Sequence, residues 1–184
     1  GSEMCIRDRY FAGTHVNPRV TWWSKSAPFI DYMHRVQMLA QEGTFVADVL
    51  YYYGDHVPNV YPFKHSDMPG VMFGFDYDVT DENILMKLGV EDGDIVVPGG
   101  RRYKVLVLPD HRVLSLPVLK KLEMLVKEGA SVLGPKPQKA VSLSGGEKGG
   151  AEFKELADLL WGTTTGTTGQ NQYGKGIVSW GISA

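Results

Sequence analysis

The middle of the chain carries the pattern that most constrains the fold. Lys104–Asp110 (KVLVLPD) predicts a buried strand, because an unbroken apolar run stands before a proline and an aspartate. Ser115 follows at the position of an N-cap, and Gly129 ends the helix that it would begin. That helix carries apolar residues at helical spacing: Val118, Leu119, Leu122, Leu125 and Val126. Ala130–Leu133 is another short apolar run, so this segment predicts two parallel strands joined by a helix.

The same alternation continues on both sides of this unit. Residues 44–53 form a mostly apolar run rich in β-branched and aromatic residues, and residues 71–77 and 177–180 are further strand candidates. Parallel strands need crossover connections, which are usually helices that cover the sheet. The sequence therefore predicts a three-layer α/β domain with a mostly parallel sheet over residues 44–184.

The connections carry their own signals. Thr80 is expected to cap a short helix that Gly89 closes, and residues 90–103 predict a small hairpin with glycine turns. Residues 135–150 predict a loop, because they are rich in Pro, Gly, Lys and Ser. The glycine-rich end of this segment (GGEKGG) lacks the Gly-Lys-Ser/Thr of a phosphate-binding loop. A later helix is expected to end at Gly162. Its apolar positions are Phe153, Leu156, Ala157, Leu159 and Leu160.

The N-terminal part differs in character. Residues 10–25 are a loop rich in Gly, Pro, Asn and Thr, and Ser26 and Pro28 mark the start of a helix that Gly43 ends. One face of this helix is apolar: Phe29, Tyr32, Met33, Val36, Leu39 and Ala40. Such a face has to pack on something outside residues 10–43.

Composition excludes several classes of function. The net charge of −2 gives no electrostatic case for binding nucleic acid or an anionic membrane, and no apolar run approaches the roughly 20 residues of a transmembrane helix. Cys5 is the single cysteine, so no internal disulfide can form. Met4–Arg9 (MCIRDR) resembles the translation of a transposon-type sequencing adapter, and we expect residues 1–9 to be a processing artefact rather than part of the fold.

Candidate ligand-binding residues begin in the N-terminal loop. Trp22 and Trp23 are adjacent, and on an extended chain one side chain faces a cleft while the other packs inward. An indole ring can stack on the apolar face of a sugar, although both rings could equally serve the core and the helix entry. His15, Asn17 and Arg19 alternate in the same loop and could donate hydrogen bonds to sugar hydroxyls, or they could simply be solvated.

Acidic residues supply the other candidates. Asp55 directly follows the strand in residues 44–53, where α/β sheets place ligands, although a turn role explains it equally well. Asp76 and Asp78 alternate and could share a cation, but a calcium site needs six or more oxygen ligands. The five histidines show no zinc spacing. No glutamate ends an apolar strand, so a pair of catalytic carboxylates is not visible.

Several segments, taken in order, carry a family resemblance. They are GTHVNPRVTWW (residues 13–23), FVADVLYYYGD (45–55), FDYD (75–78), YKVLVLPD (103–110), GPKP (134–137) and GKG (174–176). This series resembles a bacterial α-L-rhamnosidase of glycoside hydrolase family 106. The resemblance spans residues 10–181, and the order of the segments makes it more specific than any one of them.

The resemblance implies a fragment of a large carbohydrate-active enzyme. In the family, a (β/α)8 barrel carries paired glutamates and a calcium ion, and hydrolysis inverts the anomeric centre. Residues 10–43 would be the last loop and helix of this barrel. Residues 44–184 would be the next domain, flavodoxin-like or glutamine-amidotransferase-like and truncated at its C-terminus.

Several expectations about function follow from this resemblance. His15, Asn17, Arg19, Trp22, Trp23 and Asp55 are the candidates for contact with the sugar. We expect no catalytic residue, metal or cofactor in the fragment itself, calcium only in the parent barrel, and a parent enzyme that is secreted or periplasmic. The expected partners are a carbohydrate substrate and the rest of the parent polypeptide, with no nucleic acid and no membrane. An alternative is a non-catalytic scaffold or oligomerisation domain of a β-galactosidase-like enzyme. A free-standing amidotransferase would need a cysteine nucleophile, which the sequence lacks.

Overall fold

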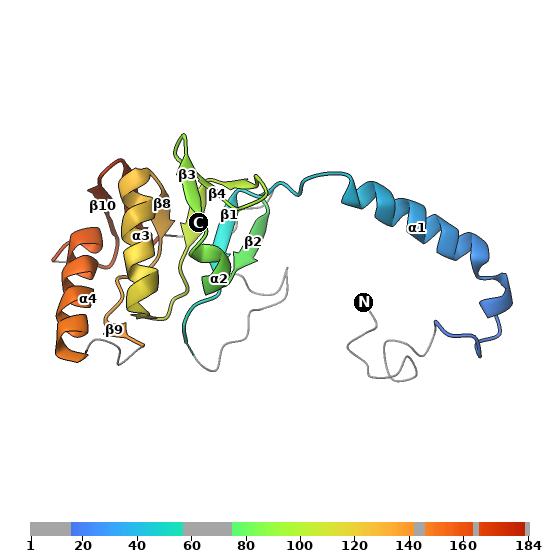
Figure 1. Ribbon diagram of the computed structural model, residues 1–184, viewed down its shortest axis with the longest axis horizontal. Coiled ribbons are helices and arrows are strands. Elements are labelled where there is room, and N and C mark those ends of the chain that lie inside the picture. Colours follow the sequence, from blue (N-terminus) through green and yellow to red (C-terminus); the bar gives the residue numbers. More distant parts are fainter. Residues whose placement is uncertain (1–15, 57–74, 142–145, 164–165, 183–184) are drawn as a thin grey trace. The chain divides into compact units, whose positions relative to one another are not determined.

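A computed structural model describes residues 16–56, 75–141, 146–163 and 166–182 of the chain (Figure 1). The chain divides into two compact units, residues 1–44 (unit 1) and residues 45–184 (unit 2). Each unit is described here by itself. Among the described residues, no helix is both long and apolar enough to cross a membrane.

The described part of unit 1 contains two helices. They are the short 3-10 helix η2 (Trp23–Lys25) and the α-helix α1 (Ala27–Gln41), which confirms the helix expected after Ser26. Pro28 lies in the first turn of α1, where its missing N–H costs nothing. Ser26 occupies the N-cap position, as predicted, but its side chain makes no capping hydrogen bond. No residue of α1 is buried.

Unit 2 is built on a six-stranded sheet. Its strands are β1 (Val49–Tyr52), β2 (Tyr77–Thr80), β6 (Val105–Val107), β8 (Ser131–Leu133), β10 (Gly169–Tyr173) and β11 (Gly176–Trp180). Their order across the sheet is β10-β11-β8-β6-β1-β2, and all neighbours are parallel except β10 and β11. The expected α/β class with a mostly parallel sheet is therefore confirmed.

Two smaller sheets flank the main one. The strands β3 (Gly89–Glu91), β4 (Asp94–Val96) and β5 (Arg102–Tyr103) form an antiparallel sheet, where a two-stranded hairpin had been expected. Asp92 and Gly93 both have positive φ, at 54° and 84°, which suits the tight turn between β3 and β4. The strands β7 (Val113–Leu114) and β9 (Lys139–Ala140) form a short parallel pair that the sequence did not predict.

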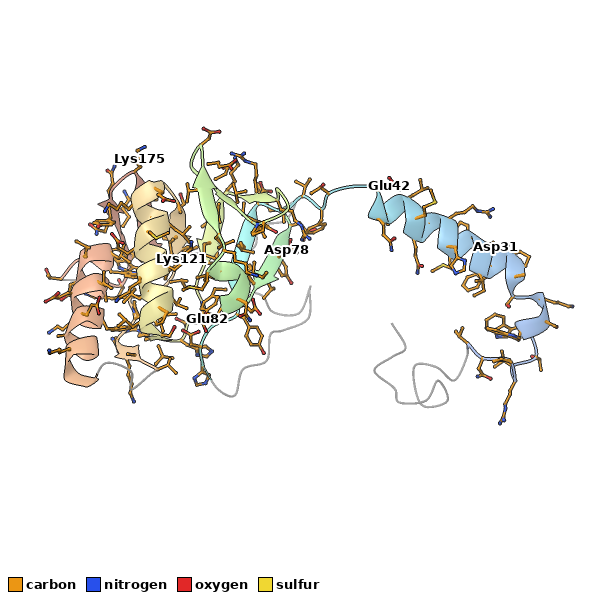
Figure 2. The ribbon with its side chains drawn as sticks, in the orientation of Figure 1. Asp31, Glu42, Asp78, Glu82, Lys121 and Lys175 are labelled. Carbon is orange, nitrogen blue, oxygen red and sulfur yellow. The ribbon has the colours of Figure 1, made fainter. Side chains whose placement is uncertain are left out.

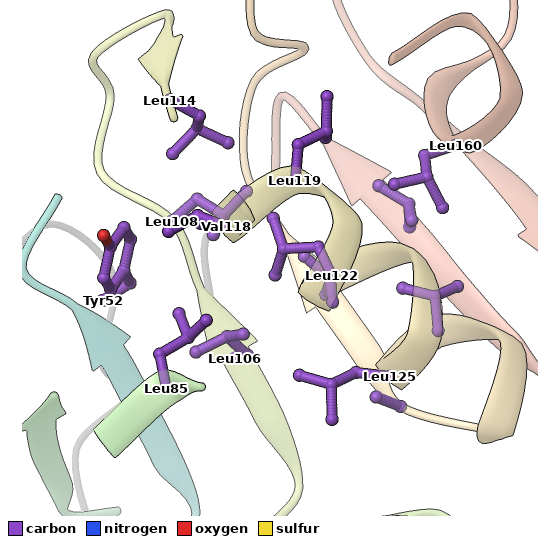
Figure 3. Packing of buried hydrophobic residues seen from close by; sticks show 14 of the residues in the cluster. Tyr52, Leu85, Leu106, Leu108, Leu114, Val118, Leu119, Leu122, Leu125 and Leu160 are labelled. Atoms are coloured by element: carbon purple, nitrogen blue, oxygen red, sulfur yellow. The ribbon is translucent and has the colours of Figure 1, made fainter. Parts of the chain in front are cut away.

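Helices α2 (Glu82–Leu85), α3 (Leu116–Glu128) and α4 (Gly146–Trp161) complete unit 2, and α3 packs against both α4 and β11. The predicted apolar stripe of α3 is buried in one cluster with Leu106, Val132 and Val178, which come from three neighbouring strands. Figure 3 shows part of this cluster, with Leu106 and four residues of α3 labelled. The approach is close at one point, because a Cβ on Gly176 would collide with the backbone oxygens of Val126 and Ala130. The packing of α3 on the sheet therefore forms the main core.

The opposite face of the sheet carries a smaller apolar cluster. Val49, Tyr51, Val107 and Leu133 are buried there, as expected for strands whose alternate side chains point to opposite faces. Among the described residues of unit 2, the helices contribute only to the main core. The three-layer arrangement, and its assignment as flavodoxin-like or glutamine-amidotransferase-like, therefore stay predictions.

The strand expected at residues 71–77 is displaced along the chain. Residues 71–74 lie outside the described residues, and β2 begins only at Tyr77 and continues through Thr80. Thr80 is thus the last residue of a strand and not a helix cap. Asp81 caps α2 instead, because its carboxylate accepts a hydrogen bond from the Ile84 N–H at 3.0 Å, and this contact lowers the pKa of Asp81. Gly89 does not close α2; it begins β3.

The loop expected at residues 135–150 is also partly wrong, because α4 already begins at Gly146. Phe153, Ala157, Leu160 and Trp161 bury one side of this helix, and tertiary packing of this kind overrides the low helix propensity of glycine. β10 was missed because its residues are mostly polar. The Asn171 side chain donates to the backbone oxygens of Leu159 and Leu160 and so joins β10 to the end of α4.

The packing of α3 predicts a large difference between two substitutions on the same helix. Leu122→Ala removes a fully buried side chain and should lower the free energy of unfolding by about 2–5 kcal/mol. Met124→Ala removes an exposed side chain and should change the free energy by no more than about 0.5 kcal/mol. Urea unfolding followed by circular dichroism measures both, and equal losses would contradict the packing described here.

Candidate functional site

The N-terminal loop does not have the extended form on which the prediction for the tryptophans rested. Trp22 has helical backbone angles, with φ −88° and ψ −6°, and η2 begins at the next residue. The ring centroids of Trp22 and Trp23 lie 6.3 Å apart with their planes tilted by 54°. The two rings are therefore neighbours, and the expectation that they point to opposite sides is wrong.

Trp22 also contacts α1. Its ring meets the ring of Phe29 edge to face, at a centroid distance of 6.4 Å and an angle of 88°, which is a favourable geometry for aromatic pairs. Trp22 nevertheless keeps 39% of its surface exposed, and Trp23 is half-buried. Trp22, Trp23 and Phe29 are here called the aromatic cluster. They pack together at the N-terminal end of α1, and the indole ring of Trp22 remains partly exposed.

The polar residues of the loop are arranged as a turn. The Asn17 carboxamide oxygen accepts a hydrogen bond from the backbone N–H of Arg19 at 2.9 Å, and the Asn17 backbone oxygen accepts one from Val20 at 3.2 Å. Asn17 and Arg19 therefore do not lie along an extended strand, and the alternation expected for them is wrong. His15 lies outside the described residues.

The second group of candidates lies between β1 and β6, where the order in which the chain adds strands to the sheet reverses. The chain passes from β1 to β2 on one side, whereas from β6 it passes to β8 on the other side. The crevice beyond the carboxyl ends of two such strands is the usual ligand site of open α/β sheets. Asp55 and His56 follow β1 at this point, His111 follows β6, and Ser115 follows the short strand β7.

Asp55 joins these two connections. Its carboxylate accepts hydrogen bonds from the Tyr52 hydroxyl and, at 2.6 Å, from the backbone N–H of Ser115. Ser115 is itself the N-cap of α3 and accepts a bond from the Val118 N–H. Burial, and then the hydrogen bond to Asp55, raise the pKa of Tyr52. Both oxygens of Asp55 are thus engaged in fixing the end of β1 to the start of α3.

Two histidines meet beside this carboxylate. The rings of His56 and His111 stack with their centroids 4.3 Å apart and their planes 26° from parallel. His56 is half-buried, while His111 is exposed. His111 was not predicted as a site residue from the sequence. Its position in the sequence could have identified it, because His111 comes two residues after Pro109, just beyond the buried strand β6. His56 has a similar position beyond the neighbouring strand β1.

The Asp76 and Asp78 pair does not form the cation site that had been considered. Asp78, on β2 (Figure 2), accepts hydrogen bonds from the Arg101 guanidinium at 3.1 Å and from the Tyr103 hydroxyl at 2.7 Å. Asp76 accepts one from the Tyr77 N–H at 2.8 Å. Burial and the bond to Asp78 raise the pKa of Tyr103 to about 12. Within the described ranges, no three histidine, cysteine or acidic side chains come together in a way that could hold a metal ion.

Comparison with known proteins adds a family to this geometry. The sequence pattern of glycoside hydrolase family 106, described as alpha-L-rhamnosidase, matches residues 9–184. A protein of Formosa agariphila, provisionally named a beta-glucuronidase, is 41% identical over 152 residues. The match covers 83% of this chain but only 13% of the Formosa protein.

A solved structure is also similar. The rhamnosidase from Novosphingobium sp. PP1Y shares 31% sequence identity with this chain and superposes with a TM-score of 0.70. The superposition covers 88% of this chain and 15% of the Novosphingobium chain. The chain therefore spans less than a sixth of the length of either relative. Its mixed α/β fold is similar to that of part of a rhamnosidase.

The contacts of Asp55 predict its contribution to stability. Asp55→Ala leaves the Tyr52 hydroxyl and the Ser115 N–H without their acceptor, which should lower the free energy of unfolding by about 1–3 kcal/mol. Asp110→Ala, which removes an exposed carboxylate beyond β6, should change it by no more than about 0.5 kcal/mol. Because Tyr52 and Asp55 share a bond, the effects of Tyr52→Phe and Asp55→Ala should be less than additive in urea unfolding. Additive effects would mean that the bond contributes nothing.

Proposed function

Because the chain belongs to glycoside hydrolase family 106, we propose that it is one segment of a larger α-L-rhamnosidase that removes terminal rhamnose from glycans or glycosides. The observation that carries the proposal is the family match over residues 9–184, which covers nearly the whole chain. The short share of each relative that the chain spans supports the view that the complete enzyme is several times longer.

In this proposal the two units come from different parts of the enzyme. Residues 10–43 are the last loop and helix of the catalytic (β/α)8 barrel, and residues 44–184 are the α/β domain that follows. The exposed apolar face of α1 supports this division, because a helix with such a face is normally packed on a core. Unit 2, by contrast, has its own core, in which α3 packs on one face of the main sheet.

The catalytic groups belong to the barrel and lie outside this chain. An inverting glycosidase uses one carboxylic acid to protonate the leaving oxygen and a carboxylate, roughly 6.5–9.5 Å away, to activate water. The best-placed acidic residues in the described chain are engaged otherwise, since Asp55 binds Tyr52 and Ser115 and Asp78 binds Arg101. We therefore expect the isolated chain to be inactive. A calcium ion, if the parent enzyme uses one, belongs to the same barrel.

The contribution of this chain to the sugar site is binding rather than chemistry. Active sites of such barrels lie on the loops that follow the strands, and residues 10–25 are such a loop in the proposed arrangement. The exposed indole of Trp22 can stack on a pyranose ring. His15, Asn17, Arg19 and Trp23 are the other candidates of this loop. Asp55 is a weaker one, because its oxygens are already hydrogen-bonded.

The alternative function is a non-catalytic scaffold or oligomerisation domain. The hydrogen bonds of Asp55 favour this role for unit 2. Its carboxylate joins the end of β1 to the start of α3, so both of its oxygens are already engaged within the fold and are poorly available to a ligand. The two roles are compatible, because unit 2 can brace the barrel while the N-terminal loop contacts sugar.

Hydrolysis of chromogenic glycosides tests the proposal. The parent polypeptide, reached by reading the coding sequence upstream of Tyr10, should release nitrophenol from para-nitrophenyl α-L-rhamnopyranoside, and the 184-residue chain should release none. The para-nitrophenyl β-D-glucuronide is the second substrate, since one relative carries a glucuronidase name. Cleavage of the glucuronide alone would overturn the rhamnosidase proposal.

Substitution in the parent enzyme tests the role of Trp22. Trp22→Ala should lower kcat/KM for the rhamnoside by roughly two- to thirteenfold, the equivalent of the roughly 0.5–1.5 kcal/mol that an aromatic contact contributes. Val16→Ala, at an exposed position of the same loop, is the control and should leave kcat/KM unchanged. A fall in the melting temperature with unchanged kcat/KM would instead assign Trp22 to packing.

A further inference from the structure

The carboxyl edge of the main sheet carries a pair of histidines that the proposed function does not use. His56 follows β1 and His111 follows β6, and these two strands are parallel neighbours in the sheet. The two rings lie face to face, with their centroids 4.3 Å apart and their planes 26° from parallel. The crevice beyond two such strands is the usual ligand position of an open α/β sheet. The pair therefore stands where a ligand is expected.

The separation of the two rings suits a shared metal ion. An imidazole nitrogen binds a zinc ion at about 2.0–2.1 Å, which puts the metal about 3.2 Å from the ring centroid. Two imidazoles that bind one ion at roughly 90–110° to each other therefore have centroids about 4.5–5.3 Å apart. The observed separation of 4.3 Å lies just below this range. His111 is exposed, so its ring can turn about its side-chain bonds and bring a nitrogen toward the same point as His56.

The charges at this edge of the sheet favour a cation. Asp55 accepts its two hydrogen bonds from uncharged donors, the Tyr52 hydroxyl and a backbone N–H, which leave its negative charge in place. Burial and the bond to Asp55 raise the pKa of Tyr52, and the charges of further carboxylates, Glu82 and Asp81, raise it as well. The two charged residues next to His111 in the sequence have opposite signs and offset each other. The carboxylates therefore make the potential at this edge negative.

We propose that His56 and His111 form a binding site for a divalent transition-metal ion of the zinc class. Imidazole nitrogen suits Zn²⁺, Ni²⁺ and Cu²⁺, whereas Ca²⁺ and Mg²⁺ take oxygen ligands. Within the described ranges no group of three histidine, cysteine or acidic side chains is present, so water or an external ligand takes the remaining positions. A bound ion joins the connection after β1 to the connection after β6 and so stabilises unit 2.

This site is independent of the proposed function. Sugar binding belongs there to the N-terminal loop, and any calcium belongs to the barrel of the parent enzyme. The histidine pair lies in unit 2 and takes another class of ion, so the 184-residue chain itself is suitable for the test. The site also departs from the expectation that the fragment carries no metal.

Titration of zinc chloride into the 184-residue chain tests the proposal. The reference chain and all variants carry Cys5→Ser, because a thiolate is itself a zinc ligand. Calorimetry measures the affinity, and NMR of the imidazole rings identifies the histidines that bind. His56→Ala and His111→Ala are the test variants. His34→Ala, at an exposed position of α1 in unit 1, is the matched control.

The reference chain should bind one zinc ion, and the ring signals of His56 and His111 should change together up to one equivalent. Loss of either histidine should weaken binding at least about tenfold, since even the groups that orient a metal ligand contribute about 10–100-fold. His34→Ala should keep the reference affinity within about twofold, because sites that share no partner act independently. Zinc should also raise the melting temperature of the reference chain and of His34→Ala, and calcium chloride should not.

Three outcomes would overturn the proposal. An absence of saturable zinc binding would reduce the histidine pair to a contact between two loops. Undiminished zinc affinity in His56→Ala and His111→Ala, each folded by circular dichroism, would place the binding elsewhere in the chain. Equal responses to zinc and to calcium would mean a site built of oxygen atoms. The NMR titration needs no substitution, so it decides the question even if one variant unfolds. Hydrolysis of the rhamnoside by the parent judges the proposed function separately.

Discussion

The burial of one face of α3 against the parallel sheet is the interaction on which the rest of unit 2 depends. The buried positions of α3 reach three neighbouring strands at once, through Leu106, Val132 and Val178. The end of the helix approaches β11 so closely that only glycine fits at position 176. α3 thus covers the central strands, and α4 packs beside it to cover the strands toward the antiparallel edge.

The sequence predicted the elements in which several local signals coincide. α3 has a capping serine, a complete apolar stripe and a terminal glycine with positive φ, and all three signals indicate the same boundaries. β2 and β10 have no such agreement. Their strand character comes from pairing with β1 and β11, which is a property of the folded sheet, while Asp78 and Asn171 give them a polar sequence.

The candidate site was predictable in position but not in role. Asp55 was found because polar residues after a buried strand lie at the ligand edge of a sheet. Its partner Ser115 is distant in the sequence, so no local pattern could show that the carboxylate is already occupied. The prediction for the two tryptophans was wrong for another reason. It assumed an extended backbone, whereas the chain forms a turn at Asn17 and then the 3-10 helix η2.

The hydrogen bond between Asp55 and Ser115 also has a consequence for the order in which unit 2 folds. It joins residues that are 60 positions apart, and the entropy of closing such a loop is lost only when β1 and α3 are both in place. Helical turns form locally and far sooner. The start of α3 can therefore become helical while the Ser115 amide is still open to water. Once the Ser115 amide is bonded to Asp55, its exchange with solvent deuterium becomes slow. The onset of this protection would therefore report when β1 joins the sheet during folding.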